Sequence, residues 1–372
     1  MTPLEVIVAM SGGVDSSVAA AVLVEQGHEV TGVTLDIWPA PEHDDTADTA
    51  QGSISTSPSG RSCCGFTAAR DASRVCHALG IPHYVLNFRD VFEKTVIDDF
   101  CHEYRRGRTP NPCIRCNQLV KFEALLERVK ALGADLLATG HYARVVKEDD
   151  TFALLKGVDR SKDQSYALYT LTQDRLRLVR FPVGEMTKEQ VRAKAAALGL
   201  RVAGKAESQE ICFVPDGDYT GFVRRGCPAP RPGKIVDTTG REVGEHPGIE
   251  CYTVGQRKGL GAALPGPRYV VRIEPETDVV VVGAEEELYS SELEAEEVTW
   301  TTPSPPPLPL AAKAKVRYNM EESAAVVTEP IEGRLLVRFE RPQRAIAPGQ
   351  AVVFYAGDRV LGGGTIAEAR KG

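Results

Sequence analysis

The sequence predicts an α/β protein in which a doubly wound parallel sheet is followed by two small β domains. In the first half, short apolar runs alternate with segments of helical periodicity, which is typical of βαβ units and a parallel sheet. In the second half, short β-type runs are separated by glycine-containing turns. The length of 372 residues exceeds one ordinary core, so two or three domains are expected.

The N-terminal elements follow one another in a regular order. Residues 14–26 place Val18, Val22 and Leu23 on one helical face, and Gly27 stands where a glycine commonly ends a helix. Strands are predicted on either side of this helix, at Val6–Met10, Val30–Trp38, Tyr84–Phe88 and Asp135–Thr139. Parallel sheets bind ligands beyond the carboxyl ends of their strands, so we expect the functional site there.

The rest of the chain divides by composition. Residues 39–62 contain almost no apolar side chains and are expected to form a flexible insertion, either a plain solvated loop or a lid over the site. The change to short strands begins at about Asp216. The proline-rich run at 301–309 is expected to be a linker or a sheet edge.

Bulk composition narrows the class of protein. The net charge of −7 gives no global sign of nucleic-acid binding, although a local basic groove is compatible with it. Nine cysteines without a secretory signal indicate free, catalytic or metal-binding thiols and not a disulfide framework. The sequence has neither the apolar run of about 18 residues that a membrane span needs nor an H-E-x-x-H zinc motif. We therefore expect a cytoplasmic, multidomain protein that bears thiols.

A phosphate-binding loop is predicted at residues 10–17, M-S-G-G-V-D-S-S, which connect the first strand to the first helix. Backbone N–H groups of a glycine-rich turn at a helix N-terminus bind anionic oxygens. Ser11, Ser16 and Ser17 add hydroxyl groups, and Asp15 could orient a metal ion or cap the helix. An ordinary capping turn would use the same residues, but the position inside a βαβ unit favours a phosphate site. The lysine of a Walker A loop is absent.

A C-x-x-C motif lies in T-P-N-P-C-I-R-C-N at 109–117, before a helical pattern that ends at Gly133. Asn111 is the expected N-cap and Pro112 the first helical residue. Cys113 and Cys116 then lie in the first turns, where the helix dipole lowers a thiol pKa. This position favours reactive or metal-binding thiols over a pair of small buried ones. Cys212, in E-S-Q-E-I-C-F, has an apolar context that by itself predicts a core residue.

The motifs, taken together and in order along nearly the whole chain, resemble those of the tRNA-specific 2-thiouridylase family. They are S-G-G-V-D-S-S, N-P-C-I-R-C-N, A-T-G-H-Y-A-R (138–144), K-D-Q-S-Y-A-L (162–168), E-S-Q-E-I-C-F, T-V-G-Q-R-K-G-L (253–260) and V-R-Y (316–318). The first motif is also similar to the PP-loop of the ATP pyrophosphatase superfamily, which cleaves ATP between the α and β phosphates. Such a loop grips the departing pyrophosphate and needs no Walker lysine.

The resemblance implies three domains: an ATP-pyrophosphatase domain at 1–215, a small central β-rich domain at 216–285 and a C-terminal β-barrel at 286–372. It implies Cys116 as the nucleophile and Cys212 as the persulfide carrier. ATP would be held by Ala9, Met10, Ser11, Gly12, Gly13, Val14, Asp15, Ser16, Leu35 and Gly140. The tRNA would be contacted by Asn111, Pro112, Cys113, His141, Lys162, Asp163, Gln164, Arg317, Tyr318 and Gln350, with Asn111–Cys113 near the target base.

Two positions depart from the family pattern. Some members have an aspartate where this chain has Cys113, so an acid–base role does not transfer to it. The nucleotide-contacting residue of the second strand is often methionine, whereas this chain has Leu35.

The reaction implied is 2-thiolation of the wobble uridine of tRNA with ATP and Mg²⁺. ATP adenylylates the C2 oxygen, and a persulfide on Cys212 supplies sulfur, itself replenished by a sulfur carrier or a cysteine desulfurase. Cys116 then either resolves the remaining sulfur bond as a disulfide or first releases hydrosulfide. An iron–sulfur cluster on Cys113, Cys116 and Cys212 is an alternative. Another PP-loop ligase of the amidotransferase type, or a non-catalytic RNA-binding protein, also stays open.

The sequence also offers candidates for phosphate contacts and further thiols. The basic run R-R-G-R at 105–108 and Arg224–Arg225 are the best candidates for contacts with RNA phosphates, or else they are solvated surface arginines. Cys63–Cys64 follows the flexible insertion, and these thiols have either no special role or a catalytic one near the ligand-binding end of the sheet. The other thiols, at Cys76, Cys101, Cys227 and Cys251, are expected to be structural.

Overall fold

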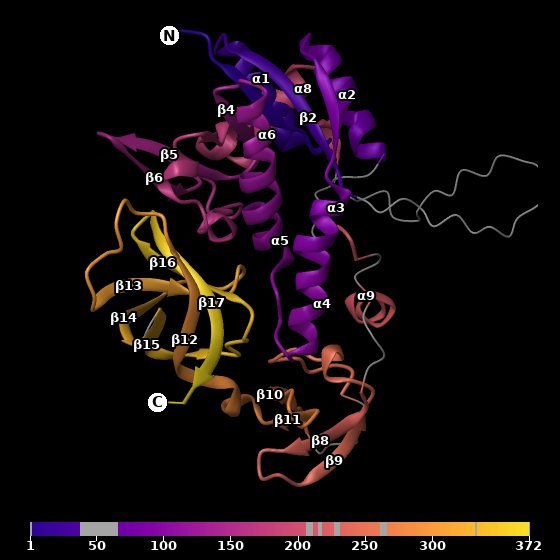
Figure 1. The fold of residues 1–372 in the computed structure, drawn as a ribbon, viewed down its shortest axis with the longest axis vertical. Helices are drawn as coiled ribbons and strands as arrows, with labels where there is room; N and C mark the ends of the chain where they lie inside the picture. Colours follow the sequence, from indigo (N-terminus) through magenta and orange to yellow (C-terminus); the bar gives the residue numbers. More distant parts are fainter. Residues whose placement is uncertain are drawn as a thin grey trace, which may run out of the picture.

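A computed structural model describes residues 2–37, 66–205, 211–214, 218–226, 231–260, 266–331 and 333–371. The predicted insertion at 39–62, together with Cys63, Cys64 and Cys227, lies outside the described residues. The described chain forms three parts: a helix-covered sheet, a small central β unit and a barrel (Figure 1).

The N-terminal part contains a five-stranded sheet in the order β3-β2-β1-β4-β7, and every neighbouring pair is parallel. Its strands are β1 (Glu5–Ala9), β2 (Glu29–Asp36), β3 (His83–Asn87), β4 (Leu136–Thr139) and β7 (Val179–Arg180). The four predicted strands are confirmed with ends shifted by one or two residues, and β7 was not predicted.

Helices cover both faces of this sheet, which confirms the doubly wound prediction (Figure 1). Val6 and Val8 pack in one apolar cluster with helices α1 (Val14–Glu25), α2 (Phe66–Leu79) and α8 (Lys188–Ala197). The intervening Ile7 belongs to a second cluster with α4 (Asp98–Arg105), η2 (Cys116–Leu125) and α6 (Leu126–Ala131). Side chains that alternate along a strand point to opposite faces, so both faces of β1 are buried. Gly27, with φ of +80°, ends α1 as predicted.

Shorter helices complete this part and link it to the rest. They are α3 (Arg89–Phe92), η1 (Glu93–Ile97), α5 (Pro112–Arg115), η3 (Ser165–Leu168), α7 (Gln173–Leu176), η4 (Pro182–Glu185), η5 (Arg201–Gly204), η7 (Ile249–Cys251) and η8 (Glu285–Leu288). None of the helices in the described segments is long and apolar enough to cross a membrane.

The central unit begins with α9 (Tyr219–Gly226) and has four strands in the order β10-β11-β8-β9. They are β8 (Gly233–Asp237), β9 (Glu242–His246), β10 (Tyr269–Glu274) and β11 (Val279–Gly283). Ile235, Val270, Val280 and Val282 form its small core. The sequence-based expectation of a β-rich unit here is confirmed.

The C-terminal part is a closed barrel in the order β12-β15-β14-β13-β16-β17, and β12 pairs with β17 to close it. Its strands are β12 (Tyr289–Trp300), β13 (Leu310–Lys315), β14 (Ser323–Ile331), β15 (Arg334–Arg344), β16 (Ala351–Ala356) and β17 (Arg359–Arg370). The proline-rich run at 301–309, expected to be a linker or a sheet edge, joins β12 to β13 within the barrel. Prolines suit a connection here because they donate no hydrogen bond to a sheet.

An unpredicted hairpin connects the first and last parts of the chain. Strands β5 (Ala143–Glu148) and β6 (Thr151–Lys156) follow the parallel sheet in sequence but extend the barrel sheet beside β17. Leu155 pairs with Arg359, and the Lys156 amide donates to the Asp358 carbonyl at 2.9 Å. The barrel is therefore tied to the N-terminal part through its own sheet.

Candidate active site

The predicted phosphate loop lies between β1 and α1, at the carboxyl end of the sheet. Gly12 has φ of +65°, and a Cβ at this position would lie 2.3 Å from the Ala68 carbonyl oxygen, so only glycine fits. Gly13 is the N-cap of α1 and no side chain caps the helix there. Asp15 is therefore not the cap. The first-turn N–H groups of this twelve-residue helix present an anion-binding end.

The serine hydroxyls hold the loop in shape. Ser17 is fully buried and its hydroxyl donates to the Gly13 carbonyl at 2.8 Å. Ser16 donates to the same carbonyl at 3.3 Å, and its Oγ accepts from the Ser11 amide at 3.1 Å. In this arrangement Ser16 and Ser17 act on the loop's own backbone.

A lysine reaches this loop from a distant helix. Lys188, on α8, places its Nζ 2.8 Å from both carboxylate oxygens of Asp15. Tyr142 donates its phenolic hydrogen to Asp15 at 2.7 Å, and its ring lies under the same ammonium group at 5.5 Å. The charge of Asp15 is thus balanced within the protein.

A second lysine contacts the glycine turn itself. Lys205, directly after η5, donates to the Gly12 carbonyl at 3.0 Å and forms an ion pair with Asp71 at 2.8 Å. Its side chain is about one third exposed. Neither lysine was predicted, because neither lies in a recognisable motif; only the fold brings residues 188 and 205 to residues 12–15.

Gly140 and His141 follow β4, the strand next to β1. A Cβ at Gly140 would lie 2.5 Å from the Ser16 amide nitrogen, so this glycine allows the backbone to approach the start of α1. His141 packs against the rings of Phe122 and Phe181, and its Nδ1 is 2.6 Å from Thr139 Oγ1. Burial, together with the charge of Lys121, holds the pKa of His141 well below its usual value, so the imidazole is neutral at pH 7.

The other residues expected to hold ATP lie at the strand ends. Met10 and Leu35 are buried, and Ala9 is partly buried. Thr34 bridges the two strand ends, donating its hydroxyl to the Met10 carbonyl at 2.9 Å. The predicted nucleotide residues are thus brought together at one edge of the sheet.

The C-x-x-C segment starts a helix as predicted. Asn111 caps it by accepting from the Ile114 amide at 3.3 Å, and Pro112 is the first helical residue of α5. Cys113 is exposed, whereas Cys116 is half-buried. From Cys116 onward the helix widens to a π-helix, η2, so Val120 and Leu125 join Phe122 in the core and Leu119 stays only half-buried.

Cys212 lies in a turn at residues 211–214 that is anchored by its neighbour. The Phe213 ring packs edge-on against Phe92 at 5.6 Å and Phe100 at 5.2 Å. Cys212 is half-buried and packs against the same apolar cluster as Cys116. Cys212, whose sequence context predicts a core residue, and Cys116, at a helix start, therefore pack against the same apolar cluster.

A preformed metal centre is not found in the described part of the chain. No group of three or more His, Cys, Asp or Glu side chains there is arranged to hold a metal ion. Cys113, Cys116 and Cys212 therefore do not form a ready three-thiolate site. Of the thiols expected to be structural, Cys76, Cys101 and Cys251 are buried, and burial raises the pKa of Cys76 to about 11.

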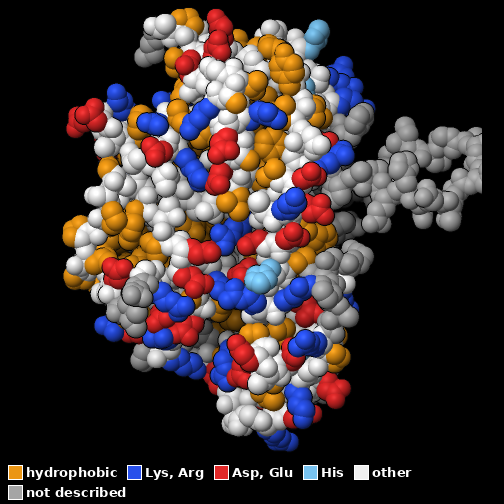
Figure 2. All heavy atoms as spheres, viewed as in Figure 1, with side chains coloured by type: hydrophobic (Ala, Val, Ile, Leu, Met, Phe, Trp, Pro, Cys, Tyr) orange, Lys and Arg blue, Asp and Glu red, His pale blue; other side chains and the backbone are white. Residues whose placement is uncertain are grey.

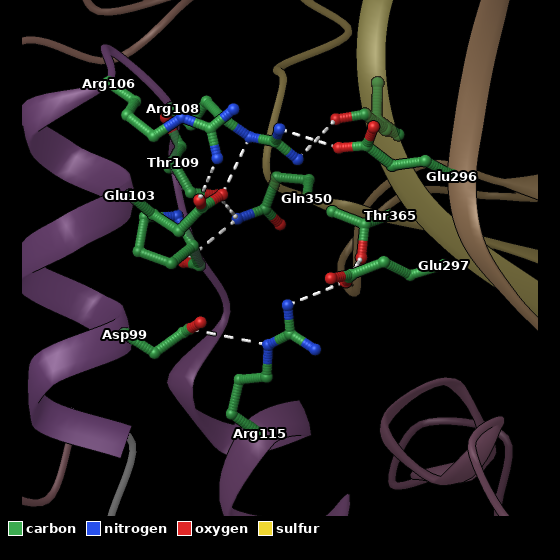
Figure 3. A network of polar contacts seen from close by, with 12 residues as sticks. Asp99, Glu103, Arg106, Arg108, Thr109, Arg115, Glu296, Glu297, Gln350 and Thr365 are labelled. Atoms are coloured by element: carbon green, nitrogen blue, oxygen red, sulfur yellow. Dashed lines mark hydrogen bonds and ion pairs between the residues drawn. The ribbon is translucent and has the colours of Figure 1, made fainter. Parts of the chain in front are cut away.

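The barrel directly holds the segment that carries the cysteines (Figure 3). Arg108 is 2.7 Å from Glu103 on α4 and 2.7 Å from Glu296 on β12. The Thr109 amide donates to the Pro348 carbonyl at 2.7 Å, and Gln350 Nε2 donates to the Thr109 carbonyl at 2.9 Å. Arg108, one of the proposed phosphate-binding arginines, is thus an interior contact between the two parts.

An arginine next to Cys116 continues this interface. Arg115 extends between Asp99 on α4 and Glu297 on β12, at 3.4 and 2.7 Å (Figure 3). Thr365 on β17 donates to the same Glu297 oxygen at 2.9 Å. Burial disfavours the charge of Glu297, but Arg115 outweighs this and lowers the pKa of that carboxyl.

Several residues expected to contact tRNA also make contacts within the protein. Asp163 accepts from the Gly157 and Ser165 amides at 3.0 and 3.2 Å, and Gln164 accepts from the Tyr142 amide at 3.0 Å. Arg317 donates to the carbonyls of Val254 and Ala345 at 3.0 and 2.6 Å, which joins the central unit to the barrel.

The charged side chains of one face of the molecule are mixed in sign. On the face seen in Figure 2, Lys and Arg side chains are interspersed with Asp and Glu side chains. Of the other predicted tRNA contacts, Lys162 is half-buried and the Tyr318 side chain is 40% exposed. Arg224 is exposed and lies 3.5 Å from the Cys251 sulfur.

Comparison with known protein families covers all three parts of the chain. Residues 4–216 match the family described as the tRNA methyl transferase HUP domain. Residues 221–284 match the tRNA methyl transferase PRC-barrel domain, and residues 290–366 match the aminomethyltransferase beta-barrel domain.

Full-length relatives share about half of the residues. The tRNA-specific 2-thiouridylase MnmA of Carboxydothermus hydrogenoformans is 53% identical over 97% of this chain and 97% of its own. Proteins of the same description from Acetivibrio thermocellus and Geobacter metallireducens are 50% and 51% identical. They are matched over 98% and 97% of this chain and over 100% and 96% of their own.

Fold and site together define an ATP-using enzyme of the PP-loop class, with a glycine-rich loop at a helix start and two thiols packed against one apolar cluster. The relatives match this chain over nearly its whole length. The chain belongs to the tRNA-specific 2-thiouridylase family, as the motifs predicted, and is a tRNA sulfurtransferase.

Proposed function

We propose that this enzyme thiolates C2 of the wobble uridine in tRNA by adenylylating the C2 oxygen and delivering sulfur from a persulfide on Cys212. The observation that carries the proposal is the joint presence of an uncapped, glycine-rich helix start and two half-buried thiols on one apolar cluster. The first arrangement suits ATP activation, and the second suits sulfur transfer. A tRNA substrate places the proposed activity in the cytoplasm.

For activation, the first-turn N–H groups of α1 would bind phosphate oxygens of ATP, with Ala9–Ser16, Leu35 and Gly140 around the nucleotide. Lys205 lies beside the glycine turn and would stabilise the negative charge that develops on departing pyrophosphate. Lys188 neutralises Asp15, which keeps an unpaired carboxylate away from the phosphates. Both Asp15 oxygens are engaged in this way, and the described residues offer no other ready Mg²⁺ site, so no step is assigned to Mg²⁺.

For sulfur transfer, the terminal sulfur of the Cys212 persulfide attacks C2, a carbon–sulfur bond forms, and AMP leaves with the former C2 oxygen. The Cys116 thiolate then attacks the Cys212 sulfur. The sulfur–sulfur bond to the base breaks, 2-thiouridine is released, and a Cys116–Cys212 disulfide forms, which an external thiol must reduce. In the alternative order, Cys116 first releases hydrosulfide from the persulfide, and hydrosulfide attacks C2. A sulfur carrier or a cysteine desulfurase would reload Cys212.

For tRNA binding, Asn111, Pro112 and Cys113 would lie near the target base, since Cys113 is exposed at the helix start. His141, Lys162 and Tyr318 are proposed to contact the RNA. Asp163, Gln164, Arg317 and Gln350 are held by protein contacts, and we propose that they shape the RNA surface in addition to any contact with it.

The test is thiolation of an unmodified tRNA transcript with ATP and a persulfide donor, read by nucleoside mass spectrometry. Cys116→Ser and Cys212→Ser should each abolish 2-thiouridine, while Cys101→Ala, which alters a buried thiol of α4, should not. Full product from both serine variants would favour a different PP-loop ligase. Unchanged pyrophosphate release on adding tRNA and donor would favour a non-catalytic RNA-binding protein.

The iron–sulfur alternative has its own test. Iron and acid-labile sulfide are measured on protein purified without oxygen, beside the activity of Cys113→Ser. The persulfide route predicts no stoichiometric iron and activity in Cys113→Ser. A cluster on the three cysteines predicts iron in the wild type and loss of both iron and activity in the variant.

A further inference from the structure

A cavity of about 320 Å³ lies between the cysteine helix and the barrel. Its walls include Arg115 and Gln118 at the helix start, Tyr169 and Thr170 after η3, and Glu297 on β12. This volume is at the lower end of the range of about 300–1,000 Å³ for small-molecule sites. The cavity therefore has room for one small polar unit.

One threonine in the wall of this cavity has a buried hydroxyl without a hydrogen-bond partner among the described residues. Thr170 is only 4% exposed, and its Oγ1 makes no hydrogen bond to any described residue. Buried polar groups are almost always hydrogen-bonded, because leaving one unpaired costs free energy. Thr170 Oγ1 is itself closed to solvent, so a rotation of the Thr170 side chain would be needed to pair this hydroxyl with a group bound in the cavity.

The guanidinium of Arg115 is shared between two carboxylates, which is one more than its charge balances. Asp99 lies on α4, and burial, only partly opposed by Arg115, raises the pKa of that carboxyl. Glu297 is the more exchangeable partner, since its side chain is 54% exposed. It stands at φ of +50° beside a bulge of β12, a backbone conformation that a glutamate rarely adopts. An arginine in this position matches a phosphate as well as a carboxylate.

The neighbouring cavity identifies where such a phosphate would come from. A smaller hollow on the other side of Arg115 is lined by Asn111, and Arg115 and Tyr169 form part of the walls of both. Asn111 belongs to the segment proposed to meet the target base. A phosphate at Arg115 would then lie within one or two nucleotides of that base.

We propose that the cavity binds a nucleotide of tRNA that flanks the target uridine, with its phosphodiester replacing Glu297 on Arg115 and a sugar or base group pairing with Thr170 Oγ1. This inference rests on the proposed function. Glu297 holds Arg115 in place when RNA is absent and is displaced when RNA binds. Arg115 then has two negatively charged partners in both states, Asp99 with Glu297 when RNA is absent and Asp99 with the phosphodiester when RNA is bound.

The test is a binding cycle with synthetic anticodon stem-loop RNA. Each phosphate near the wobble uridine is replaced singly by a neutral methylphosphonate, and affinity is measured for wild type, Arg115→Gln and Glu297→Gln. Matched controls are Arg338→Gln and Glu292→Gln, since this pair joins β12 to β15 at 2.7 Å on the outside of the barrel. Thermal unfolding of Arg115→Gln checks that this variant folds. If Arg115→Gln does not fold, Glu297→Gln still tests the proposal, because it alters an exposed side chain.

Arg115→Gln should weaken binding about ten-fold and lower the slope of log affinity against log salt by about 0.7–0.9. One methylphosphonate should weaken wild type by a similar factor and leave Arg115→Gln unchanged. Glu297→Gln should bind RNA more tightly, because the competing carboxylate is gone. The inference would be overturned if Glu297→Gln bound the RNA more weakly than the wild type does. It would also be overturned if every methylphosphonate reduced the affinity of the wild type and of Arg115→Gln by the same factor.

Failure of the inference can be told from failure of the proposed function. Wild-type thiolation of the same stem-loop, read by mass spectrometry, tests only the function. If the stem-loop is thiolated but Arg115 is not coupled to any phosphate, the proposed subsite is refuted and the proposed function stands. If Arg115 is coupled to a phosphate but no 2-thiouridine forms, the proposed function is refuted and an RNA phosphate site at Arg115 remains.

Discussion

The interface between the barrel and the cysteine segment can be tested through Arg108→Gln. The Arg108 side chain is 11% exposed and lies 2.7 Å from carboxylates of both Glu103 and Glu296. Breaking a buried ion pair by removing one partner costs about 3–5 kcal/mol, because an unpaired charge stays buried. Glu296 is 26% exposed and Arg106 also contacts Glu103, so hydration and that second arginine reduce the loss. We expect the unfolding free energy to fall by about 3 kcal/mol, the lower end of that range.

Two measurements check this expectation. Urea unfolding of the full chain gives the loss of free energy, with Arg338→Gln as the control. That arginine is 67% exposed, so its pair with Glu292 should contribute less than about 1 kcal/mol. Hydrogen exchange reports the interface itself, because the Thr109 amide donates to Pro348 across it. Arg108→Gln should speed exchange in the peptide containing residue 109. Equal unfolding free energies for the two variants, with exchange at Thr109 unchanged, would refute the reasoning.

Three further predictions follow from the contacts around the site. Lys205→Met removes a positive charge beside Gly12, so it should raise the KM for ATP and slow pyrophosphate release by about ten-fold or more. A pyrophosphate assay measures both effects, and the control is Lys194→Met, which alters a surface lysine paired with Glu25. The pKa of His141 is lowered in the folded chain, so at acidic pH the unfolded chain binds a proton on this residue that the folded chain does not. The unfolding free energy should therefore fall as the pH drops below about 6.5. Between pH 7.5 and 5.5 this fall should be smaller in His141→Gln than in the wild type. Gln350→Ala loses its hydrogen bond to Thr109 and should change the alkylation rate of Cys113 without any tRNA present; an unchanged rate with weakened tRNA binding would instead assign Gln350 to the RNA alone.

Local signals in the sequence predicted most of the first sheet and the start of the cysteine helix. The alternation of strands and helices places the phosphate loop at the sheet edge, and Asn111 and Pro112 mark the helix start by their own hydrogen-bonding properties. These features depend on residues close together in the chain, so periodicity and capping rules suffice to find them. The π-helical widening after Cys116 lies beyond such rules, because neither periodicity nor capping marks where it begins.

The missed features all depend on contacts between distant residues. Lys188 and Lys205 have no special neighbours in sequence, yet both reach the phosphate loop. The β5–β6 hairpin reads as part of the first domain, although its sheet partner is β17. The strongly basic run at 105–108 predicts a contact of Arg108 with RNA phosphates, and only the fold shows the two carboxylates beside it. A single sequence carries no signal for such pairings.

The contacts between the barrel and the cysteine segment also bear on how the enzyme is made. Thr109 depends on Pro348 and Gln350, which leave the ribosome about 240 residues later, or roughly 10–50 s at about 5–20 residues per second. During that interval the segment with Cys113 and Cys116 has no barrel to hold it. The cysteine segment thus gains its contacts with the barrel among the last steps of biosynthesis, and a chain that ends prematurely before the barrel carries these thiols without that support.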